Sequence, residues 1–113
     1  MEIKYKIWID ENSELVFGRG RNDILQALNE EHSLNAAAKK LRMSFRGAWG
    51  RIKVSQERMG IKLITISDNH RTSQLTQEAR AISARFEKLE KDMEKLIREA
   101  DQDFEKLICN REK

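Results

Sequence analysis

The sequence predicts an α+β fold that is mainly helical, and three observations support this. Two segments with helical periodicity, residues 33–41 and 44–59, are joined by a turn of about three residues, "RMS", and the second is basic. A pair of short alternating segments follows at 61–76, and from there no helix breaker occurs for more than thirty residues. Together they indicate a winged helix-turn-helix, preceded by a β-hairpin and followed by a long C-terminal helix.

The N-terminal segment predicts the first hairpin. In "EIKYKIWI" the apolar residues at 3, 5, 7 and 9 alternate with Lys4, Lys6 and Trp8, which is typical of a strand with one buried face. "DENSE" supplies turn residues and "LVF" a return strand, and "GRGRND" then interrupts the pattern. A first helix is expected from about Asn22 to Glu31. Trp8 would cover that helix or lie in a dimer interface.

The next two helices carry clear end signals. Ser33 is a candidate N-cap for a helix that contains the small residues of "NAAAKK", and Ser44 is a candidate N-cap for the third helix, at about 44–59. Gly60 stands where a helix would end in a left-handed residue. The apolar stripe expected on the third helix consists of Phe45, Ala48, Trp49, Ile52 and Met59. Its spacing favours core packing of Trp49 over stacking on a base.

The remaining elements are a wing and a long helix. "IKLITIS" and "TSQLT" predict two strands around the turn "DNHR", and Thr76 is a candidate N-cap for the final helix. Apolar residues then recur with alternating steps of three and four, which is a heptad seam that needs a second surface to cover it. The residues expected to mediate dimerisation are Ile82, Phe86, Leu89, Met93, Leu96, Ala100, Phe104 and Leu107.

Charge and composition indicate the partner. Residues 39–62 contain eight basic residues and one acid, a net charge of +7, whereas residues 77–113 have a net charge of −1. A solvated surface would mix the two signs more evenly, so this concentration favours a nucleic-acid face. Cys109 is the sole cysteine, no apolar run approaches a membrane span, and the N-terminus lacks a signal-peptide core. These features predict a cytoplasmic protein.

The third helix is the candidate DNA-reading element. At about 100° per residue, Arg46, Gly47, Gly50 and Lys53 share the side away from its apolar stripe. The two glycines would let the backbone approach a duplex; the alternative is that they accommodate a crossing helix within the fold. Ser44 and the neighbouring backbone N–H groups would receive a phosphate, and Arg51 lies at the border of this side.

The other polar residues offer little chemistry. His70 and Arg71 at the wing tip are candidate DNA contacts, and His32 is expected at the surface. The two histidines are not joined by Cys or Asp at metal-ligand spacing, so no metal site and no cofactor are expected. No nucleophile motif, carboxylate pair or phosphate-binding glycine loop is present. An enzyme is therefore not expected.

"SLNAAAKKLRMSFRGAWGRIK", residues 33–53, resembles the N-terminal DNA-binding domain of ModE-type molybdate-responsive transcriptional regulators, which is similar to that of LysR-type regulators. The matching features are "AAAKKLRMS", then an aromatic residue, a basic residue and "AW" before Ile52. "MGIKLITI" and "LTQEA" resemble the wing strand and the entry to the following helix. The resemblance covers roughly residues 15–85.

This resemblance implies DNA-reading positions at Ser44, Arg46, Gly47, Gly50 and Lys53, a phosphate contact at Arg51, and dimerisation through the helix from Thr76 onward. Two departures limit it. The chain ends where the molybdate-binding domains would begin, so no molybdate site is expected, and the wing lacks the glycine-rich insertion often seen in the family.

The sequence thus predicts a DNA-binding region at 1–75 and a dimerisation helix at 76–113. The expected function is sequence-specific binding of double-stranded DNA by a homodimeric transcriptional regulator. The alternative is a protein-interaction adapter that uses the winged helix and the heptad seam to dock other proteins. The orientation of the helices in the dimer is left open, because the charges beside the seam are mixed.

Overall fold

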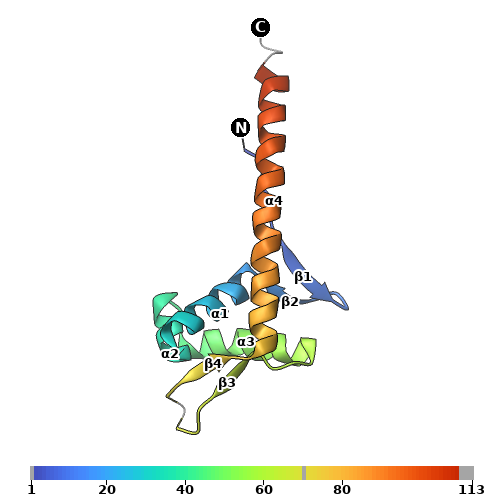
Figure 1. Ribbon diagram of the computed structural model, residues 1–113. Coiled ribbons are helices and arrows are strands. Elements are labelled where there is room, and N and C mark those ends of the chain that lie inside the picture. Colours follow the sequence, from blue (N-terminus) through green and yellow to red (C-terminus); the bar gives the residue numbers. More distant parts are fainter. Residues whose placement is uncertain (1, 70, 110–113) are drawn as a thin grey trace.

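The computed structural model describes residues 2–69 and 71–109. They form a β-hairpin, three helices, a second β-hairpin and a long final helix, in the order that the sequence predicts (Figure 1). The elements are β1 (Trp8–Glu11), β2 (Glu14–Gly18), α1 (Arg19–Glu31), α2 (Leu34–Lys40), α3 (Phe45–Met59), β3 (Ile64–Ile66), β4 (Ser73–Leu75) and α4 (Gln77–Cys109).

A single apolar core joins α1, α2 and α3 to β2, to the β3–β4 hairpin and to the first turns of α4. Its buried side chains include Phe17, Ile24, Leu25, Leu28, Ile52 and Leu63. Ala37, Ala38 and Ala48 are also buried, and their small side chains let α2 and α3 pack closely. This core fixes which side of α3 faces outward.

The N-terminal hairpin is shorter and more exposed than the sequence predicts. β1 and β2 pair antiparallel, and both loop residues, Asn12 and Ser13, have positive φ (53° and 66°), as a two-residue type I′ turn requires. All of β1 is exposed, and so is Tyr5 before it, so the predicted buried face is wrong at residues 5 and 9. The physical reason is that β2 supplies the core residues of this two-stranded sheet, and none of the described elements covers the outer side of β1 at Ile9. Ile3 is half-buried, and Ile7 packs against the core as predicted.

Helix α1 begins at Arg19, three residues earlier than predicted. Within "GRGRND", Gly18 thus ends β2 and the next five residues form about the first turn and a half of α1. Gly20 costs a helix about 1 kcal/mol relative to alanine. The burial of Ile24, Leu25 and Leu28 on the same helix outweighs that cost.

The predicted ends of α2 and α3 are confirmed. The side chain of Ser33 accepts a hydrogen bond from the backbone N–H of Ala36, and that of Ser44 accepts one from Gly47 N–H. Gly60 ends α3 with φ of 72°. Phe45 is an exception to the predicted stripe, because it is 48% exposed rather than part of the core.

The wing and the long helix point in opposite directions from the domain (Figure 1). β3 and β4 form an antiparallel hairpin with shorter strands than predicted, and α4 follows it directly. Thr76 caps α4 as expected: its Oγ1 accepts a hydrogen bond from Ala79 N–H and donates one to the carbonyl of Lys62. The 33 residues of α4 give the molecule a longest dimension of 67 Å.

Candidate nucleic-acid interface

Helix α3 has one buried side and one outward side. Ala48, Ile52 and Ser55 are fully buried, whereas Arg46 and Lys53 are exposed and Gly50 is half-buried. The outward strip formed by Arg46, Gly50 and Lys53 thus lies on the side of α3 away from the core. Glu57, one turn after Lys53, is exposed and of opposite charge, so the basic character belongs to the N-terminal half of α3.

The start of α3 is organised by Ser44 and Gly47. A Cβ atom on Gly47 would lie 3.0 Å from the Ser44 hydroxyl oxygen and 3.4 Å from Arg51 Nη1. Arg51 lies back along the helix and donates a hydrogen bond to the Gly47 carbonyl at 3.2 Å. Gly47 therefore has a role inside the protomer, since it leaves room for the helix cap and for the guanidinium of Arg51.

Gly50 differs from Gly47. Apart from its two chain neighbours and the adjoining backbone of α3 itself, no atom of the described residues lies within 4 Å of the position that its Cβ would occupy. A crossing helix thus explains neither glycine. At Gly50 the backbone of α3 is open to any molecule that approaches from outside.

Arg51 also belongs to a cluster of arginines that the sequence analysis did not identify. Partial burial of Arg21 on α1, followed by the positive charges of Arg51 and Arg58, lowers the pKa of Arg21. Arg21 donates a hydrogen bond to the buried Ser55 hydroxyl at 3.1 Å. Arg58 is held by Glu14 at 3.0 Å. These charges repel each other, so a polyanion near Arg21 and Arg51 would be attracted.

The wing brings Arg71 toward the start of α3. Ser67 and Asn69 hydrogen-bond within the wing loop, where the Asn69 side chain accepts from Arg71 N–H at 3.0 Å. Ser73 N–H donates to the carbonyl of His32, which ties the wing to the end of α1. Arg71 is exposed, and His70, the other predicted wing contact, lies outside the described residues.

A cleft of about 320 Å³ lies between the wing and the start of the helices. Phe45 from α3, Ile66 from β3 and Arg71 from the wing loop line it, together with Ser33 and Asn35 at α2. Sequence reasoning missed Phe45 and Ile66 as surface residues. Their apolar character suits a core as well as a binding surface, so no local signal distinguishes the two.

The predicted dimerisation seam on α4 divides into two parts. Phe86 is 3% exposed, and its ring meets that of Phe17 edge-on with centroids 5.3 Å apart. Ile82 also packs against the core. Phe86 is therefore unavailable to a second copy, and its assignment to the dimer seam is wrong. The rest of the predicted seam, called the distal seam below, is half-buried or exposed: Leu89, Met93, Leu96, Ala100, Phe104 and Leu107.

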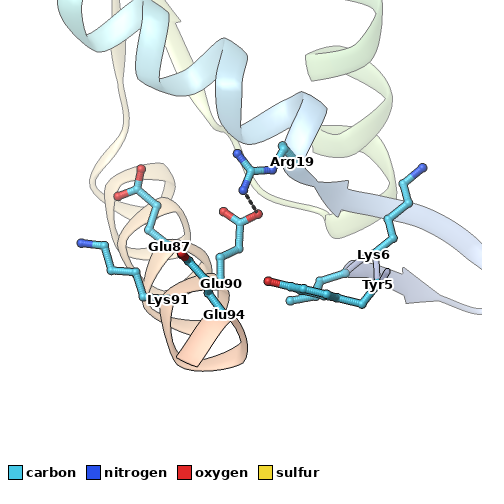
Figure 2. Close-up of a pocket in the computed structure, with 8 residues that line it drawn as sticks. Tyr5, Lys6, Arg19, Glu87, Glu90, Lys91 and Glu94 are labelled. Atoms are coloured by element: carbon cyan, nitrogen blue, oxygen red, sulfur yellow. Dashed lines mark ion pairs between the residues drawn. The ribbon is translucent and has the colours of Figure 1, made fainter. Parts of the chain in front are cut away.

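Polar contacts fix the direction of α4. The Ser83 hydroxyl donates to Asn22 and accepts from Gln26, both on α1. Figure 2 shows Arg19 of α1 reaching Glu90 of α4, and the two groups are 2.8 Å apart. Tyr5 lies beside this pair and lines a cleft of about 590 Å³ along α4. The long helix is thus anchored to the domain along its first half.

The described residues contain neither a candidate metal cluster nor a candidate membrane-spanning helix. Among residues 2–69 and 71–109, no three His, Cys, Asp or Glu side chains are grouped so that they could hold a metal ion. None of the helices within these ranges combines the length and the apolar character needed to cross a bilayer.

Comparison with known proteins supports the fold. No protein-family model matches the sequence, and no curated protein is significantly similar to it. Among solved structures, the chain is similar to a BenM DBD in complex with benA site 1 DNA, with a TM-score of 0.58, 20% identity and coverage of 74% of this chain and 91% of that one. It is also similar to a CbnR DBD in complex with DNA, with a TM-score of 0.54, 24% identity and the same coverages. The predicted winged helix-turn-helix fold, with a long helix after the wing, is confirmed.

Proposed function

We propose that this protein binds double-stranded DNA in a sequence-specific manner and acts as a homodimeric transcriptional regulator. The observation that carries the proposal is the outward strip of Arg46, Gly50 and Lys53 on α3, which is basic, lacks bulk at its centre and lies opposite the buried side. Two proteins with similar folds, BenM and CbnR, have been crystallised with DNA. Their folds support the proposal but do not assign DNA contacts to this chain.

In this proposal the N-terminal half of α3 enters the major groove. Arg46 has the fork of donors that recognises a guanine edge, and Lys53 would neutralise a phosphate. Gly50 would allow the helix backbone close to the base edges. Ser44 would donate its hydroxyl proton to a phosphate while its oxygen still accepts the Gly47 N–H.

The flanking contacts are electrostatic. Arg51 and the wing residue Arg71 are exposed and would approach the phosphate backbone on either side of α3. Each such contact releases counterions, so affinity should fall steeply as salt is raised. Arg21 strengthens the field around Arg51 without reaching the groove.

Homodimerisation is the second half of the proposal, and the distal seam supports it. Leu96, Phe104 and Leu107 are exposed on one long helix, and Leu107 is 64% exposed. A second copy of α4 would cover these side chains and would place two α3 helices on one duplex. Two-fold symmetry then requires half-sites whose centres are about 34 Å apart, or a multiple of that spacing.

The test is titration of a fluorescent duplex with Arg46→Ala and Lys53→Ala over a range of salt concentrations. A binding site would first be selected from a pool of random duplexes. Loss of the Lys53 contact should reduce the slope of log affinity against log salt by about one unit. Loss of Arg46 should cost about 1–3 kcal/mol at one base pair.

Lys95→Ala is the matched control, because Lys95 is an exposed cation on α4 far from α3. It should leave both the affinity and the salt slope unchanged. If Arg46→Ala and Lys53→Ala behave like Lys95→Ala, α3 is not the DNA-reading helix and the proposal is wrong.

The exposed distal seam also favours a second candidate, a protein-interaction adapter in which α4 binds a different protein. Sedimentation separates the two. The regulator should show a concentration-dependent monomer–dimer equilibrium, whereas the adapter should stay monomeric until its partner is added. The ModE-type relationship, the cytoplasmic location and the lack of enzymatic activity stay predictions.

A further inference from the structure

Two large apolar side chains are exposed on the same cleft beside α3. Phe45 is 48% exposed and Ile66 is 39% exposed, and they come from different elements, the first turn of α3 and the wing strand β3. Both line the cleft of about 320 Å³ whose rim carries Arg71. Apolar groups that gather at a surface in this way mark a binding surface more often than isolated exposed residues do.

The position of the cleft indicates what would occupy it. It lies between the helix proposed to enter the major groove and the wing, and a DNA strand bordering that groove would pass through this gap. Arg71 supplies a positive charge at the rim, and Arg46 follows Phe45 directly in α3. The occupant is therefore expected to combine an anionic group with an apolar group.

One nucleotide of the backbone has this combination. Its phosphate is anionic, and its deoxyribose presents C–H groups, including a C2′ that carries no hydroxyl in DNA. A thymine methyl group is a poorer candidate. Phe45 lies about 100° around the helix from Arg46, so its side chain is directed toward the wing rather than along the outward strip.

We propose that this cleft seats one deoxyribose and its phosphate, with Phe45 and Ile66 packed on the sugar and Arg71 paired with the phosphate. This inference rests on the proposed function. The contact carries no base information, so it fixes the register of α3 on the duplex without reading sequence. It also discriminates against RNA, because a 2′-hydroxyl pressed against Phe45 and Ile66 would lose its hydrogen bonds to water.

The first experiment compares Phe45→Ala, Phe45→Leu and Ile66→Ala with the wild-type chain on a selected duplex and on a random one. Phe45→Ala and Ile66→Ala should weaken binding to both duplexes equally, by at least about fourfold, the effect of one buried CH₂ group. Phe45→Leu should retain most of the affinity. Ile9→Ala, which truncates an equally exposed apolar residue on β1, should change nothing.

The second experiment places a single ribonucleotide at each position of the selected duplex in turn. One position in each half-site should weaken wild-type binding by about fourfold or more, and this penalty should disappear in Phe45→Ala. Absence of a sensitive position, or a penalty that persists in Phe45→Ala, overturns the inference.

The outcomes also separate this inference from the proposed function. If the wild-type chain binds no duplex, both are wrong. If the wild-type chain binds and the Phe45 and Ile66 variants bind as well as the wild type does, only the proposed deoxyribose site is wrong. If replacing one thymine with uracil abolishes the effect of Phe45→Ala, then Phe45 contacts a base methyl group, and the proposed deoxyribose site is again wrong.

Discussion

Helices α3 and α4 are both amphipathic, but they leave different surfaces uncovered. The apolar side of α3 is covered by its own domain, apart from Phe45, and the side that remains outward is basic. On α4 the domain covers the first turns, up to Phe86, and the apolar side of the second half is half-buried or exposed. The outward side of α3 therefore lacks a counter-charge, and the second half of α4 lacks an apolar partner.

This difference favours different kinds of partner for the two helices. A polyanion satisfies the basic side of α3, whereas an apolar helix face is satisfied by another apolar surface. The anchor of α4 on α1, through Ser83 and the Arg19–Glu90 ion pair, keeps the two surfaces in a fixed relation. A dimer formed through the second half of α4 would then set the distance between two copies of α3.

The largest expected effect tests where α4 passes from the part covered by the domain to the distal seam. Phe86→Ala should lower the free energy of unfolding by about 3–5 kcal/mol, because it opens a cavity beside Phe17. Phe104→Ala removes an equally large ring from an exposed position and should cost less than about 0.5 kcal/mol in the monomer. Urea unfolding at several protein concentrations measures both. Equal losses of unfolding free energy for the two variants would show that Phe86 and Phe104 do not lie in differently covered parts of α4.

A smaller effect is expected in the distal seam itself. In a dimer, burial of Leu96 and of Leu107 would each contribute up to about 1.5–3 kcal/mol per copy. The double variant Leu96→Ala, Leu107→Ala should therefore raise the dimer dissociation constant at least about tenfold, while the unfolding of the monomer is unchanged. Analytical ultracentrifugation gives the constant, with Lys95→Ala as the control. An unaltered dimer would place the interface elsewhere.

Much of this fold follows from local sequence signals. Ser33, Ser44, Gly60 and Thr76 mark helix ends at or next to the residues where the structure has them, because capping involves only neighbouring backbone groups. The basic stretch of α3 is likewise a local property. The element order could be predicted for the same reason.

The errors in the prediction concern what covers an apolar residue. Periodicity shows that Phe86 and Phe45 lie on apolar stripes, but it does not show that Phe17 covers the first while about half of the second stays exposed. Arg21 was missed as part of the basic surface because it joins Arg51 only when α1 packs on α3. Contacts between residues far apart in the chain leave no local signal.

Variants of Ser44 separate its role as helix cap from its proposed DNA contact. Ser44→Ala removes the acceptor for Gly47 N–H and should cost about 1 kcal/mol of stability. Ser44→Asp retains a good N-cap and should preserve stability, but its negative charge would repel a phosphate. Ser44→Asp should thus be the more stable variant in thermal unfolding, and Ser44→Ala the tighter binder in duplex titration. If Ser44→Asp binds DNA as well as the wild type does, no phosphate approaches this end of α3.

The smallest expected effect comes from adding one methyl group at Gly50, which tests whether the backbone of α3 approaches DNA at the outward strip. Gly50→Ala should stabilise the protein by up to about 1 kcal/mol, because alanine favours the helix. Apart from its two chain neighbours and the adjoining backbone of α3, no atom of the described residues lies within 4 Å of the added methyl group. The same methyl group would stand between α3 and a bound duplex, so DNA affinity should fall while stability rises. Gly47→Ala, in contrast, should lower both DNA affinity and stability, since its Cβ would press on the Ser44 hydroxyl. A Gly50→Ala variant with higher stability and undiminished affinity would mean that the backbone of α3 does not approach the groove, because the methyl group has no other neighbour to meet.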